Sequence, residues 1–390
     1  MPGVPAGFVP PSTQPSDAQE LSFDDASNSW HVSSHAACRQ VLRDEETFAR
    51  TDQFSASARA VRGDTRSLAV LSGRDHLKLH TYLTSRVNMR ASREYRTRLI
   101  GPIARDLLSA LPAGEPVDLA AQYADKIPIR VGLAMIGVDI ADAERIERIA
   151  ELKRRFTRWS DVDRDDPEMT RLAAEASVEL KELLMPMIRD RRKNPRDDLA
   201  SEFWRSGPTV FPDWTEVDTY AACYAFLGGG ETAYAMRNAL YMLLSDEETN
   251  LAVTAEPDRT IPLLASEVLR LLGPIQWLNR VAMSDYELNG VTIRSGEAVR
   301  VVISTANRDP DIYPDPTALR LDAERRPHHL AYGHGPRYCI GVALATAEIE
   351  EALMALVSHY PAARLVDPGG SAVGGHRIRS ITPILAVLQN

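Results

Sequence analysis

Apolar residues recur every three or four positions through the middle of the chain, from about residue 94 to residue 272. The segments Arg145–Lys153 and Leu172–Leu184 show this spacing most regularly. Because one turn of an α-helix takes about 3.6 residues, such spacing places the apolar side chains on one face. The pattern predicts a series of amphipathic helices that pack on a shared core.

Strand-like segments are short and lie near the two ends of the chain. They combine β-branched residues with alternating apolar positions. The candidates are Ser29–Val32, Gly290–Ile293, Ala298–Ile303 and Ile381–Leu388. The predicted fold class is therefore mainly α with small β-sheets.

The chain contains no Gly/Ser linker, charge block or internal repeat, so we expect a single domain over residues 29–390. Residues 1–28 form a Pro-rich N-terminal segment, with five prolines among the first twenty residues. Those twenty residues contain neither Lys nor Arg and no continuous apolar run, which is unlike a signal peptide or a membrane anchor. We expect a cytoplasmic protein without a membrane segment.

Charge and cysteine content exclude several classes of function. The chain has 45 Lys and Arg against 54 Asp and Glu, a net charge of -9, which argues against nucleic acid as a partner. Its three cysteines, Cys38, Cys223 and Cys339, lie far apart and form no Cys-x-x-Cys pair. This spacing argues against a disulfide framework or a zinc ribbon.

One cysteine ends a Gly-rich segment, Tyr332–Gly341, which reads Tyr-Gly-His-Gly-Pro-Arg-Tyr-Cys-Ile-Gly and precedes a helical pattern. Cys339 is thus expected at a helix N-terminus, where backbone N–H groups and the helix dipole favour a thiolate, the form that binds iron. Gly333 and Gly341 remove side chains where the backbone would pass close to a flat macrocycle. Taken alone, the segment is more typical of a Gly-rich turn with a buried cysteine.

This segment resembles the haem-binding loop of cytochromes P450, Phe-Gly-x-Gly-x-His/Arg-x-Cys-x-Gly. The resemblance implies a haem b cofactor with Cys339 as the proximal ligand of the iron. It also implies that Arg337 pairs with a haem propionate, a carboxylate that suits the two-pronged guanidinium. Tyr332 replaces the family's Phe, which keeps an aromatic ring beside the sulfur and adds a hydroxyl that can alter the hydrogen bonding of the thiolate.

The apolar segment Val217–Met236 is helical in pattern but contains three adjacent glycines, residues 228–230. Each costs a helix roughly 1 kcal/mol, so their presence needs a reason. The segment resembles the family's distal helix, in which small residues leave room for oxygen and substrate. Glu231 and Thr232 match the family's acid–alcohol pair, which implies that the alcohol helps to hold dioxygen and the acid helps to bring protons to it. The alternative is that the glycines form a loop between two short helices.

Two further segments match the family in order. Glu267–Arg270 matches the Glu-x-x-Arg helix, a structural ion pair for which Arg325 is the expected third member. Arg280 occupies a position that the resemblance assigns to a propionate.

The segment Asp75–His80 resembles the family's acidic-His-x-x-x-Arg pattern, in which both basic residues point at propionates. His76 matches this pattern, whereas His80 stands in place of the Arg, so its contact with a propionate is a question for the structure. Two histidines at i and i+4 also fit a metal site, but the pattern offers no third ligand.

The resemblance implies a haem-thiolate monooxygenase that uses dioxygen and external electrons to hydroxylate or otherwise oxidise a small-to-medium lipophilic substrate. It implies ferredoxin and ferredoxin reductase as electron donors, because the sequence shows no flavin or iron–sulfur domain. A peroxide-driven haem-thiolate enzyme and a non-catalytic haem sensor are the alternatives, and the acid–alcohol pair argues against both. The positions implied to face substrate are Tyr224, Leu227, Gly228, Trp277 and Leu278.

Overall fold

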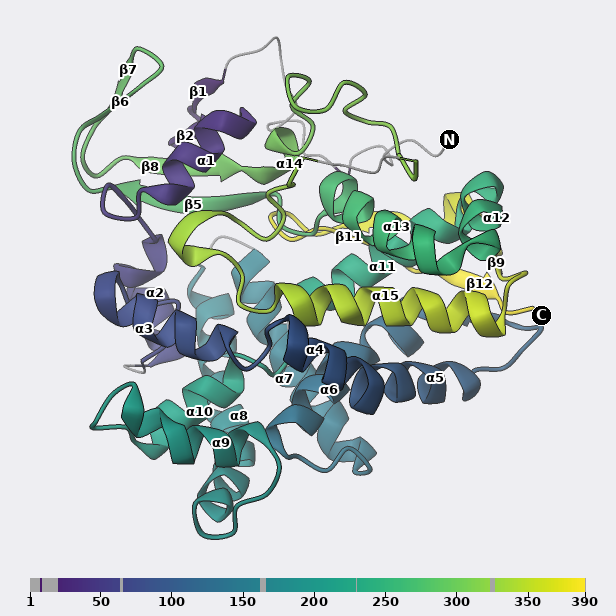
Figure 1. Cartoon of the computed structure of the whole chain (residues 1–390). Helices are drawn as coiled ribbons and strands as arrows, with labels where there is room; N and C mark the ends of the chain where they lie inside the picture. Colours follow the sequence, from purple (N-terminus) through teal and green to yellow (C-terminus); the bar gives the residue numbers. More distant parts are fainter. Residues whose placement is uncertain are drawn as a thin grey trace.

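The computed structural model describes residue 8 and residues 20–389, except for residues 64–65, 162–165, 229 and 323–326. Helices make up most of the molecule, and the largest sheet lies to one side of them (Figure 1). The long helix α15 (Val342–His359) crosses the helical part, with α11 (Gly230–Leu244) packed against it. The predicted class, mainly α with small β-sheets, is confirmed.

The remaining helices surround this pair, and the predicted amphipathic segments fall within α7 and α8. Within the described residues, no helix is both long and apolar enough to cross a lipid bilayer. The bounds are α1 (His35–Arg43), α2 (Ala56–Arg62), α3 (Gly73–Thr84), α4 (Met89–Tyr95), α5 (Gly101–Ser109), α6 (Lys126–Ile136), α7 (Ala143–Asp161), α8 (Pro167–Lys193), α9 (Leu199–Ser206), α10 (Glu216–Tyr224), α12 (Glu247–Ala255), α13 (Pro257–Leu272) and α14 (Ile303–Ala306).

The largest sheet has the strand order β1-β2-β8-β5-β3, in which only the β2–β8 pair is parallel. A three-stranded sheet has the order β4-β12-β9, and β6–β7 and β10–β11 are two-stranded. The bounds are β1 (Leu21–Asp24), β2 (Ser29–Val32), β3 (Phe48–Ala49), β4 (Pro116–Asp118), β5 (Trp277–Ala282), β6 (Tyr286–Leu288), β7 (Val291–Ile293), β8 (Ala298–Val302), β9 (Arg364–Leu365), β10 (Ala372–Gly374), β11 (Ser380–Thr382) and β12 (Leu385–Val387).

One sequence prediction about the sheets is wrong in part. The segment Ile381–Leu388 is not one strand, because β11 pairs with β10 while β12 pairs with β4 and β9. Pro383 lies between them and has no N–H to continue a ladder. The expected boundary after residue 28 stays a prediction. On its N-terminal side, β1 pairs with β2, and Phe8, 1% exposed, belongs to the main core. Most of the residues before 20 lie outside the described part of the chain.

The predicted distal helix is interrupted, so the alternative of a loop between two helices is correct. Helix α10 ends at Tyr224 and α11 begins at Gly230, with a turn between them. Gly228 has a φ of +65°, and a Cβ there would lie 2.4 Å from the carbonyl oxygen of Pro128. The turn therefore packs backbone against backbone on α6, which a helix with side chains at these positions does not allow. Gly229 lies outside the described residues.

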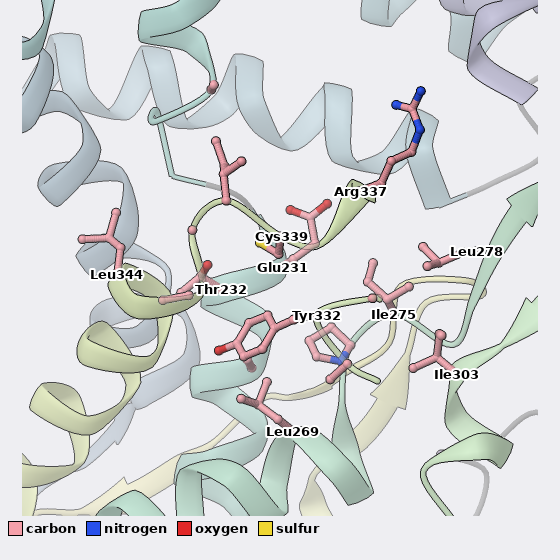
Figure 2. A pocket seen from close by; sticks show the side chains of 18 of the residues that line it. Glu231, Thr232, Leu269, Ile275, Leu278, Ile303, Tyr332, Arg337, Cys339 and Leu344 are labelled. Atoms are coloured by element: carbon pink, nitrogen blue, oxygen red, sulfur yellow. The ribbon is translucent and has the colours of Figure 1, made fainter. Parts of the chain in front are cut away.

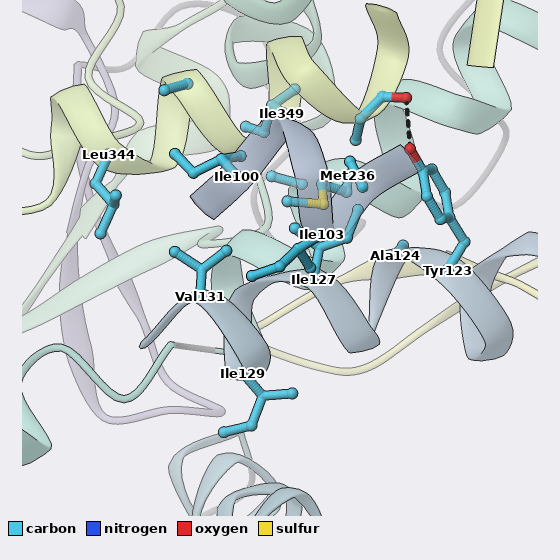
Figure 3. Close-up of a cluster of buried hydrophobic side chains, with 14 of the residues drawn as sticks. Ile100, Ile103, Tyr123, Ala124, Ile127, Ile129, Val131, Met236, Leu344 and Ile349 are labelled. Carbon is cyan, nitrogen blue, oxygen red and sulfur yellow. Dashed lines mark hydrogen bonds between the residues drawn. The ribbon is translucent and has the colours of Figure 1, made fainter. Parts of the chain in front are cut away.

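The main core joins α5, α6, α11 and α15 (Figure 3). Ile103, Ile127, Met236 and Ile349 are almost fully buried there. Each such side chain contributes about 1.5–3 kcal/mol when it leaves water. The hydroxyl of Tyr123 donates a hydrogen bond of 3.0 Å to the carbonyl of Ala352 in α15. This packing holds α15, and with it the cysteine loop that precedes it.

The Glu-x-x-Arg pair is buried, as predicted from its apolar neighbours. Arg270 and Glu267 form a two-pronged ion pair with both N···O distances at 2.8 Å, and each side chain is about 5% exposed or less. The guanidinium also donates to three backbone carbonyls, those of Asn307, Pro316 and Ala318. Arg325 lies outside the described residues. The pair thus fastens α13 to the segment that leads toward the cysteine loop.

Candidate active site

A cavity of about 440 Å³ lies between α11, α13, α15, β5 and the loop of residues 331–341. Figure 2 shows Cys339 and Glu231 on one part of its wall, with Leu278, Ile275 and Ile303 on another. The volume falls within the range of small-molecule and cofactor sites. The motifs that the sequence placed far apart along the chain therefore meet around one space.

The cysteine loop is held by its own backbone and by α1. The N–H of Cys339 donates to the carbonyl of Tyr332 at 3.0 Å, and α15 begins three residues after the cysteine. Gly335 has a φ of +74°, and a Cβ there would lie 2.6 Å from the carbonyl oxygen of Leu42. This glycine therefore lets the loop lie directly on α1. Gly333 and Gly341 both line the cavity.

Of the three cysteines, Cys339 alone opens onto the cavity, whereas Cys38 and Cys223 are buried elsewhere. The sequence predicts that the helix N-terminus favours a thiolate at Cys339. Burial raises the pKa of the Cys339 thiol, and the hydrogen bond from the Gly341 N–H offsets only part of this rise. The hydrogen bond from the Gly341 N–H thus acts in the predicted direction, whereas burial acts against it.

Tyr332 has a hydroxyl that the family's Phe lacks, and this hydroxyl forms a hydrogen bond with another side chain. Its Oη lies 3.0 Å from Oγ1 of Thr346 on α15. Burial raises the pKa of Tyr332, and the nearby Cys339 adds to the rise, so this hydroxyl lies within electrostatic reach of the sulfur. The Thr346 partner thus directs the hydroxyl toward α15.

Acidic and hydroxyl groups lie on two sides of the cavity. Glu231 and Thr232 line it from the first turn of α11. Glu348, which the sequence analysis missed, lines it from α15, and burial raises the pKa of its carboxyl to about 8. Glu348 is therefore mostly protonated at neutral pH, and the wall carries both a proton donor and polar oxygens.

Three arginines, Arg50, Arg280 and Arg337, line the same cavity. Arg280 is 6% exposed, and no carboxylate of the described residues lies within 4.0 Å of its guanidinium. Burial, with the charges of Arg50 and Arg337, lowers the pKa of Arg280 to about 9. Arg337 donates to the carbonyls of Leu68 and Leu71 and lies 2.9 Å from Glu45. In Figure 2 its side chain points away from Cys339. Arg337 thus has an acidic partner, Glu45, whereas Arg280 has none among the described residues.

The two histidines of α3 differ in their surroundings. His76 is buried, and its Nδ1 has no hydrogen-bond partner among the described residues. Burial, followed by the charges of Arg337 and His80, lowers its pKa to about 3. His80 binds the carbonyl of Tyr338 through Nε2 at 2.7 Å and does not line the cavity. His80 thus contacts the backbone next to Cys339.

The structure brings only some of the expected substrate positions to the cavity. Gly228 and Leu278 line it, whereas Tyr224, Leu227 and Trp277 do not. Tyr224 packs edge-on against Phe156, and Leu227 is fully buried in the main core. Trp277 and Leu278 are neighbours in β5, where successive side chains point to opposite faces. Trp277 therefore faces an outer chamber, described below.

Several cavity residues were not singled out from the sequence. Phe226 precedes the predicted position Leu227, and Ile275 lies two residues before Trp277. The sequence pattern around these positions could therefore have indicated both residues. Arg50, Thr51 and Asp52 belong to a short segment between β3 and α2 that carries no motif. Only the folded chain brings them to the cavity.

Comparisons with known proteins agree with this arrangement. The cytochrome P450 family model matches residues 144–366. Cytochrome P450-SOY of Streptomyces griseus is 30% identical over 381 residues, 96% of this chain and 88% of that protein. Mycinamicin IV hydroxylase/epoxidase of Micromonospora griseorubida is 30% identical over 87% of this chain and 84% of its own length. The ligand-free structure of cytochrome P450 TbtJ1 has a TM-score of 0.83, 25% identity and coverage of 95% and 94%. Since the match spans more than half of the chain, this protein belongs to the cytochrome P450 family and is a haem b monooxygenase.

Proposed function

We propose that Cys339 is the proximal ligand of the haem iron and that the haem lies in the cavity described above. The observation that carries this proposal is an accessible sulfur on the wall of the same cavity as Arg280, a buried guanidinium with no carboxylate of the described residues within 4.0 Å. Haem b brings an iron atom, which needs a thiolate here, and two propionates, which need cations. Cys339 and Arg280 meet these requirements on the wall of one cavity.

We assign one propionate to Arg280, which has no acidic partner among the described residues. His76 has a buried Nδ1 without a partner but does not line the cavity, so its contact with a propionate stays a prediction. Arg337 already contacts Glu45 and two carbonyls, so its main role is to hold the cysteine loop against residues 68–71. His80 holds the same loop through the carbonyl of Tyr338. The sequence implied propionate contacts for His76, Arg280 and Arg337 and left the contact of His80 open, so this division differs in the role that it gives to Arg337.

The bound haem supplies the reductive activation of dioxygen, which the thiolate favours by electron donation. Thr232 and Glu231 hold a hydroxyl and a carboxyl oxygen at the cavity, where protons must reach dioxygen during its reduction. Apolar side chains at Phe226, Ile275 and Leu278 exclude water and orient the substrate. The acid–alcohol pair supports a monooxygenase driven by external electrons over a peroxide-driven enzyme or a haem sensor.

The proposed substrate is a small-to-medium lipophilic molecule that is hydroxylated or otherwise oxidised. The apolar wall formed by Phe226, Ile275 and Leu278 supports this class. A relative, mycinamicin IV hydroxylase/epoxidase, is named for hydroxylation and epoxidation, which supports the same range of reactions.

The proposed electron donors are a ferredoxin and its reductase, which dock on the face beside the cysteine loop. Arg39 and Arg43 of α1 flank this loop, and Nε of Arg43 donates to His334 at 2.9 Å. These cations suit an acidic electron-transfer protein. We place the enzyme in the cytoplasm, where the three unpaired cysteines fit a reducing environment.

Replacing Thr232 by alanine is expected to leave haem binding intact and to divert electrons from product to hydrogen peroxide. The hydroxyl that helps to deliver protons is lost, so product per electron should fall roughly tenfold or more. The measurement is hydrogen peroxide formed per NADPH consumed, with a surrogate ferredoxin and reductase and a lipophilic compound that shifts the ferric spectrum.

The control for this experiment is Thr254→Ala, because Thr254 lies on α12 and does not line the cavity. Thr254→Ala should form as much hydrogen peroxide per NADPH consumed as the parent protein does. Equal peroxide yields from Thr232→Ala and the parent would contradict the role proposed for Thr232. Full turnover of the parent with hydrogen peroxide alone would favour the peroxide-driven alternative.

Replacing Thr346 by valine is expected to raise the one-electron reduction potential of the haem. Without its partner, the Tyr332 hydroxyl is free to turn toward the sulfur, and a hydrogen bond to a thiolate weakens its electron donation. A hydrogen bond of about 1 kcal/mol corresponds to roughly 40 mV for a one-electron couple. Spectroelectrochemical titration measures the shift. The double variant Tyr332→Phe/Thr346→Val should lack this rise, and a rise in both proteins would exclude the hydroxyl as its cause.

A further inference from the structure

A second unpaired cation lies on the cavity wall, apart from the group around Arg280. Arg377 lines the cavity, and no carboxylate of the described residues lies within 4.0 Å of its guanidinium. Its Nε and Nη2 both donate to the carbonyl of Ser160, at 2.9 and 2.6 Å, and its Nη1 makes no hydrogen bond with the described residues. A neutral carbonyl does not balance the charge, so one edge of the guanidinium is available to an anion.

Arg377 lies where the cavity meets an outer chamber of about 480 Å³. Thr51, Asn279 and Arg280 line both spaces together with Arg377. The chamber continues along Trp277, with the guanidinium of Arg300 5.0 Å from the centre of the indole ring. A molecule that extends from the cavity into this chamber would therefore pass Arg377.

The two spaces differ in chemistry. Both spaces have charged side chains on their walls, but Phe226, Ile275 and Leu278 line the cavity and not the chamber, which has several serines. The charges of Glu231 and Asp161 reach Arg377, and Asp161 accepts hydrogen bonds from the backbone N–H groups of residues 376 and 378. One open edge of a single guanidinium pairs with one carboxylate, so the position suits a group with a single negative charge.

We propose that Arg377 binds a carboxylate of the substrate and that the lipophilic part of the substrate extends from it into the cavity toward Thr232. This inference rests on the proposed function and narrows the substrate class to lipophilic monocarboxylic acids. The planar carboxylate matches the open edge of the guanidinium, which a neutral alcohol or ester does not. Arg280 has a different partner in this scheme, a haem propionate.

The test compares straight-chain carboxylic acids, from hexanoic to hexadecanoic acid, with the primary alcohols of the same lengths. Binding to the ferric holoprotein is followed by the spectral shift on displacement of water. For the acid of best-fitting length, we expect binding roughly tenfold or more tighter than for its alcohol, as is typical of hydrogen bonds to a charged group. Arg377→Gln should remove this preference, and Arg377→Lys, which keeps the charge but not the fork, should retain part of it.

The matched control is Arg379→Gln, because Arg379 lies in the same turn, donates to the carbonyls of His376 and Phe8, and lines neither space. It should keep the preference for acids. A parent protein that binds no acid better than its alcohol, or a preference that survives in Arg377→Gln, would overturn the inference. The reduced carbon monoxide spectrum of each variant is recorded in parallel. If the parent itself lacked the red-shifted Soret band, the haem-thiolate assignment would be wrong. A parent that shows the band but has no preference for acids would refute only the role of Arg377.

Discussion

Replacing Cys339 by histidine is expected to abolish the strongly red-shifted Soret band of the reduced carbon monoxide complex. That band requires a thiolate ligand on the haem iron, and Cys339 is the one cysteine of the chain that opens onto the cavity. Monooxygenase turnover should be lost with the band, because an imidazole donates less electron density than a thiolate. The measurement is the difference spectrum of dithionite-reduced protein with and without carbon monoxide.

The controls are Cys38→Ala and Cys223→Ala, single variants at the two buried cysteines. Cys38 donates through its sulfur to the carbonyl of Val32, and burial raises the pKa values of both thiols. Both variants should therefore retain the band. Its persistence in Cys339→His would assign the ligand to another cysteine and would refute the arrangement proposed for the cavity.

Replacing Arg270 by methionine is expected to lower the free energy of unfolding by about 3–5 kcal/mol, the usual cost of leaving a buried charge without its partner. Glu267 would keep its carboxylate in the core, and three backbone carbonyls would lose a donor. Because the pair fastens the segment before the cysteine loop, haem content should fall as well. Urea unfolding, followed by tryptophan fluorescence and by the Soret band, measures both effects.

The matched control is Arg259→Met in the first turn of the same helix, where Arg259 forms an exposed ion pair with Glu256. Exposed pairs contribute about 0–1 kcal/mol, so this variant should unfold close to the parent. Arg270→Lys keeps the charge without the two-pronged geometry, so its free energy of unfolding should lie between those of Arg270→Met and Arg259→Met. Equal unfolding free energies for Arg259→Met and Arg270→Met would show that the buried pair does not stabilise the fold.

The break between α10 and α11 shows how tertiary packing alters a correct local pattern. The apolar spacing and the glycines at 228–230 were both visible in the sequence, and both a continuous helix and a loop agreed with them. The choice depends on α6, because its backbone leaves no room for a Cβ at Gly228. A contact between residues about one hundred positions apart has no local signal in the chain.

The sequence by itself determined the fold class, the family, the haem cofactor and the positions of Cys339, Glu231 and Thr232. These features depend on residue types at short, fixed spacings, such as a cysteine after a Gly-rich turn or an ion pair at i and i+3. Only the tertiary structure decided which cations lack an acid, because the partners of Arg280 and Arg377 would have to come from distant elements, although the sequence had already singled out Arg280. It also decided that Leu278 faces the cavity while Trp277 faces the outer chamber, since the two faces of a strand acquire different neighbours only when the sheet is assembled.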